Sequence, residues 1–275
     1  MAFLKKHYLF TIWIVAVIAA TFLNVPFLYI FLGSLAYLIL VLLMRLPSTV
    51  FWLGYLTQAK DKHRDRSFRM YEYGYSHDAR PMAPMVAYGM QLLNRRQYPK
   101  GLQVLEEAVT TKDPNPTFLK IARQDLGIAY WCNGDLDKGI TTLENMVQDY
   151  DILSTDFYTT LAYFYIEKGD LLKAEEVNDE ALKQDETCGP AYDNLAQIRY
   201  RQGEKEEALE LFLKALDLKE TMVATKYYLG LLSEENGDIE SARSYFTAAH
   251  NSTITGINTV TREEVDAKYN EYLNK

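Results

Sequence analysis

The sequence predicts an all-α protein in which an apolar helical hairpin precedes a solenoid of stacked helix pairs. Two observations lead to this prediction. Glycine-centred turns recur along the second half of the chain at almost constant spacing, which is typical of repeated helix–turn–helix units. Two long uncharged apolar runs stand near the amino terminus, and such runs are typical of membrane helices.

Residues 1–47 are predicted to form a transmembrane helical hairpin. The apolar runs cover 8–25 and 27–44, with Pro26 between them. At 1.5 Å per residue each helix would span about 27 Å, close to the thickness of a bilayer core. A cleaved signal peptide is the alternative for the first run. The second apolar run argues against it, because a mature protein would start with a polar segment.

The distribution of basic residues predicts the orientation of the hairpin. Lys5 and Lys6 precede the first run, Arg45 and several more basic residues follow the second, and the connection between the runs has none. Basic residues stay on the cytoplasmic side. We therefore expect an integral protein of a bacterial inner (plasma) membrane, bound to lipid through the hairpin, with both termini and the repeat domain in the cytoplasm.

Residues 48–81 are predicted to form an interfacial or linker segment. The stretch 49–56 is apolar and aromatic, and a basic cluster follows it. Aromatic and cationic side chains together favour the headgroup layer of a membrane. The alternative is that residues 48–57 extend the second membrane helix past Pro47, and the sequence favours neither reading.

The repeats are defined by several residues that recur together. The turn glycines have spacings of 35, 34 and 34 residues, and small residues stand seven positions before and five positions after each of them. Small side chains let two antiparallel helices approach closely, glycine supplies a positive-φ turn, and a following Asp can cap the second helix. The turn glycines are Gly134, Gly169, Gly203 and Gly237, and the flanking small residues are Gly127, Ala162, Ala196 and Gly230, then Gly139, Ala174, Ala208 and Ala242.

This pattern resembles the tetratricopeptide repeat. Tyr130 and Tyr165 match its tyrosine, whereas Arg199 and Ser233 depart from it. An earlier unit keeps the register but has Arg96 at the place of the turn glycine. We expect five units over residues 82–256 and a capping helix in 257–275, which starts with a Thr261–Glu264 capping box.

The resemblance implies that the first helix of each pair lines a concave groove for a protein or peptide partner. The stripe of that helix facing the groove is apolar and aromatic in the units near the membrane and more polar further along. Such a surface suits an amphipathic helix or an apolar peptide segment. The predicted groove residues are Met90, Leu93, Ile128, Trp131, Tyr163, Ile166, Tyr200 and Tyr227.

Composition disfavours other classes of function. Residues 1–80 carry a formal charge of +5 and the remainder −13, so nucleic acid is not an expected partner of the repeats. Cys132 and Cys188 have no paired spacing, and the four histidines are scattered. We expect no catalytic residues, no metal and no cofactor.

These observations predict a membrane-anchored adaptor or scaffold that binds a protein or peptide partner on the cytoplasmic side. A peptide-responsive sensor, or a regulatory subunit of a membrane complex, is the alternative. A third hypothesis, an enzyme with a site assembled in space, has no local motif in its favour.

Overall fold

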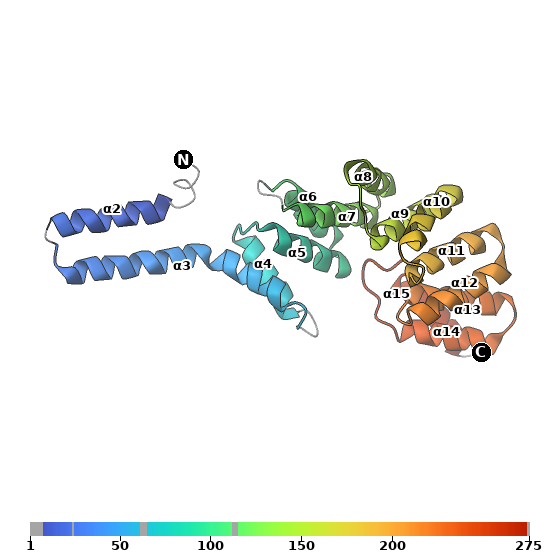
Figure 1. The fold of residues 1–275 in the computed structure, drawn as a ribbon. Coiled ribbons are helices and arrows are strands. Elements are labelled where there is room, and N and C mark those ends of the chain that lie inside the picture. Colours follow the sequence, from blue (N-terminus) through green and yellow to red (C-terminus); the bar gives the residue numbers. More distant parts are fainter. Residues whose placement is uncertain (1–7, 24, 61–64, 112–114, 274–275) are drawn as a thin grey trace. The chain divides into compact units, whose positions relative to one another are not determined.

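The computed structural model describes residues 8–23, 25–60, 65–111 and 115–273, and all regular elements in these ranges are α-helices (Figure 1). The chain divides into two compact units, residues 1–84 and 85–275. Lys5 and Lys6, on which the predicted orientation partly rests, lie outside the described residues.

The first unit begins with two helices that lie side by side, α2 (Tyr8–Phe22) and α3 (Phe27–Thr57) (Figure 1). The rings of Trp13 and Tyr37 stack between them, with centroids 5.3 Å apart. Helix α3 contains Pro47 in its interior and does not end there. Residues 48–57 therefore continue this helix, which is the second of the two readings that the sequence left open.

Helix α4 (Asp65–Ser76) packs on the carboxyl-terminal part of α3. The fully buried rings of Phe51 and Tyr71 meet edge to face at 5.5 Å. Gly74 lies so close to Phe51 that a Cβ atom there would be 2.6 Å from that side chain. This packing buries Phe51 and Gly54 on one face of residues 48–57, while Trp52, Leu53 and Leu56 on the same stretch are exposed.

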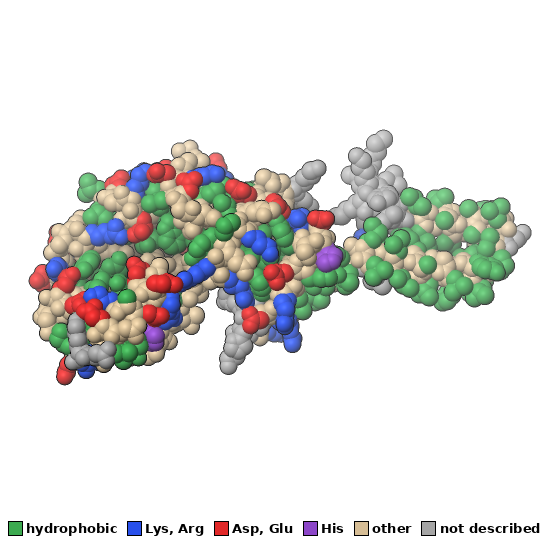
Figure 2. All heavy atoms as spheres, turned by 180° about the vertical axis from the view of Figure 1, so that it is seen from behind, with side chains coloured by type: hydrophobic (Ala, Val, Ile, Leu, Met, Phe, Trp, Pro, Cys, Tyr) green, Lys and Arg blue, Asp and Glu red, His purple; other side chains and the backbone are tan. Residues whose placement is uncertain are grey.

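Helix α3 is the one helix in the described ranges that is long and apolar enough to cross a membrane. None of its most apolar 18-residue window is buried, and its outer surface is largely hydrophobic (Figure 2). The apolar part of α2, Ile12–Phe22, is shorter than such a span. A two-helix transmembrane hairpin therefore stays a prediction.

The second unit consists mainly of five antiparallel helix pairs followed by one further helix (Figure 1). The first pair starts at the boundary between the units. The pairs are α5 (Met82–Asn94) with α6 (Tyr98–Val109), α7 (Pro116–Cys132) with α8 (Leu136–Asp149), α9 (Thr155–Lys168) with α10 (Leu171–Gln184), α11 (Gly189–Gln202) with α12 (Lys205–Leu218), and α13 (Val223–Glu235) with α14 (Ile239–His250). The last helix is α15 (Arg262–Leu273).

The turns inside these pairs have the geometry that the repeated glycines predict. The four turn glycines have φ between +75° and +86°, a region that favours glycine. Asp135, Asp170 and Asp238 each accept a hydrogen bond from a backbone N–H in the first turn of the second helix. In the first pair Arg96 adopts the same left-handed conformation, with φ +61°.

Small residues allow the two helices of a pair to touch. A Cβ atom on Gly230 would lie 2.6 Å from the ring of Phe246, and one on Gly127 would lie 2.8 Å from Leu143. The alanines at the equivalent positions, such as Ala196, are fully buried. The core of the second unit therefore follows the repeat pattern from pair to pair.

Helix α15 packs on α14, with Val265 and Tyr272 buried. The expected capping box is present, since Glu264 accepts a hydrogen bond from the Thr261 N–H and the Thr261 hydroxyl accepts one from the Glu264 N–H. Leu273, which belongs to the same apolar stripe in the sequence, is 58% exposed. The final turn of α15 thus extends past the surface that it covers.

Candidate partner-binding groove

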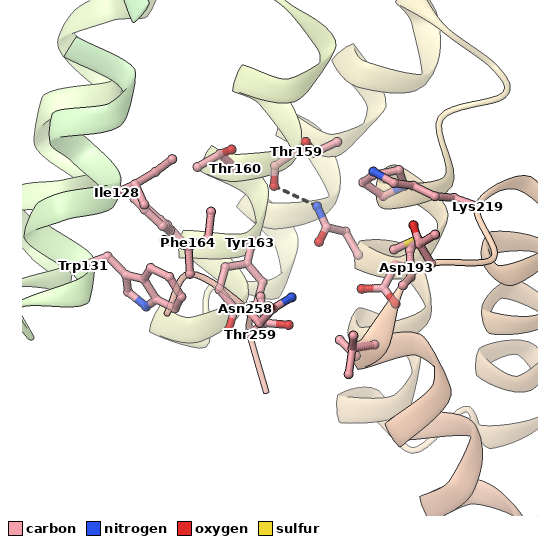
Figure 3. A pocket seen from close by; sticks show the side chains of 17 residues that line it. Ile128, Trp131, Thr159, Thr160, Tyr163, Phe164, Asp193, Lys219, Asn258 and Thr259 are labelled. Atoms are coloured by element: carbon pink, nitrogen blue, oxygen red, sulfur yellow. Dashed lines mark hydrogen bonds between the residues drawn. The ribbon is translucent and has the colours of Figure 1, made fainter. Parts of the chain in front are cut away.

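A cavity of about 440 Å³ lies beside the first helices of consecutive pairs (Figure 3). Its walls come from the first helices of consecutive pairs, α7, α9, α11 and α13, and from the loops before α13 and α15. First helices of stacked pairs lie next to each other, so their inner stripes form one continuous surface. The volume is within the range of ligand and peptide pockets in proteins.

One wall of the cavity is aromatic. The indole of Trp131 meets the Tyr163 ring edge to face at 5.7 Å and lies 5.8 Å from the Phe164 ring, and Figure 3 shows the three side chains together beside Ile128. Tyr163 is 8% exposed, and its burial raises the pKa of its hydroxyl. This wall can accept apolar or aromatic groups of a partner.

The opposite wall contains a buried carboxyl, Asp193. Its two oxygens accept hydrogen bonds from the Thr225 hydroxyl at 2.6 Å and the Gln197 amide at 2.8 Å. Burial raises the pKa of Asp193 above its ordinary value. Because both oxygens already have donors, we assign Asp193 to the packing of α11 against α13 rather than to chemistry on a ligand.

Asn194 also connects neighbouring helices. Its amide donates to the Thr159 carbonyl at 2.9 Å, the bond drawn in Figure 3, and to the Asn178 side chain at 3.1 Å. Asn178 in turn donates to the Ala191 carbonyl. These bonds fix α9, α10 and α11 in register, and they use both hydrogens of the Asn194 amide internally.

The third side of the cavity is formed by the connection between α14 and α15. We call residues 254–260 the strap. Ile257, Asn258 and Thr259 of the strap line the cavity together with the aromatic wall. The strap crosses the groove and reaches the turn between α5 and α6, where the Gly256 N–H donates to the Asn94 carbonyl at 2.9 Å.

The structure places the predicted groove residues in three different environments. Ile128, Trp131 and Tyr163 line the cavity. Leu93 and Ile166 are fully buried, and Met90, Tyr200 and Tyr227 are partly buried outside the cavity. Leu93 and Met90 belong to a cluster that the strap residue Ile257 covers. Three of the eight predicted groove residues thus line the cavity, and all three lie on α7 and α9.

The strap is the part of the site that the sequence analysis missed. Its contacts with the first pair join residues more than 150 positions apart, and no repeat period predicts such a contact. Phe164 was also missed, because it follows the groove position Tyr163 in sequence. The uncharged stretch 251–260, which contains Gly256, was the one available signal for the strap.

Family comparisons agree with the repeat geometry. A model of the tetratricopeptide repeat matches residues 155–188, and a second model of the same repeat matches residues 189–221. Residues 155–221 are two tetratricopeptide repeats. They correspond to the pairs α9–α10 and α11–α12. Tetratricopeptide repeats are protein-interaction scaffolds.

Comparison with solved structures extends the similarity to a larger part of the chain. A thermophilic TPR protein of Thermus thermophilus, TTC0263, shares the fold: it is 17% identical, covers 71% of this chain and 100% of its own, and has a TM-score of 0.58. YrrB, a TPR protein with an unusual peptide-binding site, is 14% identical, covers 72% of this chain and 97% of its own, and has a TM-score of 0.42. MamA MSR-1 is 20% identical, covers 67% of this chain and 95% of its own, and has a TM-score of 0.41. No curated protein matches this chain in sequence.

Proposed function

We propose that this protein is a membrane-anchored adaptor whose tetratricopeptide repeats hold a protein partner at the cytoplasmic face of a bacterial inner membrane. The observation that carries the proposal is the cavity in the concave groove, with Trp131, Tyr163 and Phe164 along one wall. Of these three side chains Trp131 is partly exposed, and partly exposed aromatic side chains in a groove are common anchors for a partner. Two aligned repeats, 155–188 and 189–221, form much of the surface around it.

The partner segment that suits this cavity is short and apolar. An α-helix with its side chains is about 10–12 Å wide, and the strap narrows the groove beside the aromatic wall. A volume of about 440 Å³ accepts a few side chains rather than a whole helix. Of the two partner types that the sequence allowed, an apolar peptide segment therefore fits the cavity better than an amphipathic helix.

Membrane anchoring is supported by the surface of α3. Leu35, Leu38 and Leu43 are each more than 40% exposed, on a helix with no buried residue in its most apolar window. Exposed apolar surface of this extent is costly in water. A bilayer would cover it, and tethering would raise the local concentration of the adaptor near membrane partners.

Crosslinking tests the adaptor function. A photoreactive amino acid replaces Trp131 in the full chain, and native membranes are irradiated before detergent extraction. A second variant carries the same group at Leu172, which is 81% exposed on α10 and outside the cavity. We expect a discrete protein adduct from position 131 that is absent from position 172. Identical adducts from both positions, or none from position 131, would reject the proposal.

Protease protection tests the anchoring and its orientation. Sealed, right-side-out cells are treated with an external protease, and the carboxyl-terminal repeats are followed with an antibody. We expect the repeats to survive together with a cytoplasmic control protein. Digestion of the repeats while that control survives would overturn the predicted orientation, and release of the chain from membranes by alkaline carbonate would overturn the anchor.

A further inference from the structure

The strap binds the first helix pair through its backbone. The Gly256 N–H donates to the Asn94 carbonyl at 2.9 Å, and the Tyr98 hydroxyl donates to the Gly256 carbonyl at 3.0 Å. Just beyond the strap, Arg96 Nη1 lies 3.0 Å from Glu263 Oε1. Both polar groups of the Gly256 backbone are therefore recognised by the α5–α6 turn.

The surface of the first helix pair leaves room only for glycine at position 256. A Cβ atom on Gly256 would lie 2.1 Å from the Leu93 carbonyl oxygen, so any larger residue would push the strap away. The next residue, Ile257, packs against the apolar cluster that contains Leu93 and Leu126. Peptide-binding grooves recognise short motifs in the same way. Close backbone contacts hold the peptide, and a hydrophobic pocket accepts a neighbouring apolar side chain.

Hydrogen bonds within the strap stabilise the conformation in which it binds the first helix pair. The Thr255 N–H donates to the Asn258 side-chain oxygen at 2.6 Å, and the Asn258 N–H donates to the Thr255 carbonyl at 3.3 Å. Gly256 and Ile257 thus stand at the tip of a tight turn, between two residues that close it. Preorganisation of this kind lowers the entropy cost of docking.

Helix α15 has contacts of its own that do not involve the strap. Arg262 donates to the carbonyls of His250 and Ser252, at 2.7 Å and 2.9 Å, and the Tyr272 ring lies 5.2 Å from the Phe246 ring of α14. The strap can therefore leave the groove while α15 stays on α14. Its attachment to the first pair consists of two hydrogen bonds, one apolar side chain and an ion pair whose partners are 42% and 71% exposed, and exposed ion pairs add little to such an attachment.

We propose that the strap is a built-in ligand of the groove, and that a partner protein engages the groove by presenting an uncharged tight turn with glycine followed by an aliphatic residue, in exchange for the strap. This inference rests on the proposed adaptor function. Because the strap is tethered at both ends, its effective concentration at the site is on the order of millimolar. The part of the groove on the first helix pair is then occupied until a partner with the same turn chemistry displaces the strap.

The experiment uses a synthetic probe, a cyclic peptide with the sequence of residues 253–260. Full-length protein in detergent micelles carries Trp13→Phe and Trp52→Phe, so that Trp131, which lines the cavity, is the fluorescent reporter. In one variant, residues 255–259 are replaced by a Gly/Ser linker of equal length, which keeps Ile254 and Val260 in the cluster that contains Val265. We expect this variant to bind the peptide at least about tenfold more tightly than the chain with its native strap, since the tethered competitor is gone.

A matched control peptide has alanine in place of the glycine that corresponds to Gly256, and it should bind at least about tenfold more weakly because of the Leu93 carbonyl. If circular dichroism shows that the linker variant is unfolded, Gly256→Val, which cannot dock its strap, carries the same test. Equal binding by native-strap and open-strap proteins, absence of binding to a folded open-strap protein, or equal binding of both peptides would overturn the inference. Crosslinking from position 131 does not use the peptide, so the adaptor function can stand when the strap inference fails.

Discussion

Arg199 binds Glu175 through both terminal nitrogens of its guanidinium group, at 2.6 Å and 3.1 Å. Arg199 stands at the repeat position that Tyr130 occupies in an earlier pair, where the tyrosine hydroxyl donates to Glu106 at 2.9 Å. In both cases the first helix of one pair binds a glutamate on the second helix of the preceding pair. Arg199 thus departs from the repeat pattern in sequence, but it makes the same contact between pairs that the tyrosine makes.

Loss of this contact should destabilise the repeats. Arg199 is 18% exposed and Glu175 is 32% exposed, and hydrogen bonds to charged groups at such sites contribute about 1.5–3 kcal/mol. We expect Arg199→Ala to lower the free energy of unfolding by about this amount and Arg199→Tyr to restore part of it. Urea unfolding followed by circular dichroism measures both. Lys183→Ala, which breaks an ion pair with partners 68% and 47% exposed, is the control and should change the midpoint little.

Substitution of a turn glycine should destabilise the protein through backbone strain alone. Gly203 has φ +86°, and a Cβ atom there would meet nothing within 4 Å. Gly203→Ala should therefore cost about 1–2 kcal/mol through the left-handed conformation, and Gly203→Asn should cost less, because asparagine tolerates this region. Thermal unfolding of the two variants compares them. Equal melting temperatures for alanine and wild type would contradict the argument.

Substitution of Gly230 should destabilise the protein through overpacking instead. Its helical backbone accepts alanine, but the Cβ atom would lie 2.6 Å from the Phe246 ring. Gly230→Ala should destabilise the protein by about 1–3 kcal/mol through overpacking. Combined with Phe246→Leu, the effect of Gly230→Ala should become smaller, since the two residues share one space. Additive effects in this double-mutant cycle would show that the contact is not the cause.

Asp125 should make stability depend on pH. It is 8% exposed, and burial raises its pKa to about 7. A carboxyl whose folded pKa lies above its unfolded value of 3.8 binds more protons in the folded state between these two pH values. Its contribution to stability therefore falls as pH rises from about 4 to about 7. Asp125→Asn should unfold at higher urea concentration than wild type at pH 8, and the difference should shrink at pH 5.

The repeat architecture was accessible from the sequence because each unit repeats the same physical requirements. A turn with positive φ needs glycine, and two close helices need small residues, so both recur at the period of the unit. The same reasoning placed Arg96 at a turn, where its φ is +61°. The continuation of α3 through Pro47 was left open, because the contact of Phe51 with Tyr71 on α4 has no counterpart in sequence spacing.

Only part of the cavity lining could be predicted from the sequence. Trp131 and Tyr163 lie on the predicted stripe and line the cavity, whereas Leu93 and Ile166 lie on the same stripe and are buried. Helical periodicity gives the direction of a side chain from its own helix. It does not tell which neighbouring segment will cover that side chain, and the strap covers the cluster around Leu93.

Gly256, Ile257 and Glu263 contact the first helix pair. Together these contacts tie the first pair of the array to its last helix, across up to 167 positions. An open array can melt from its ends, since each repeat depends mainly on its neighbours. A tied array has no free end until the tie breaks, so its repeats should lose structure together and in a steeper transition. Forming the tie also requires closing a very long loop, which places this step late and makes it slow during folding.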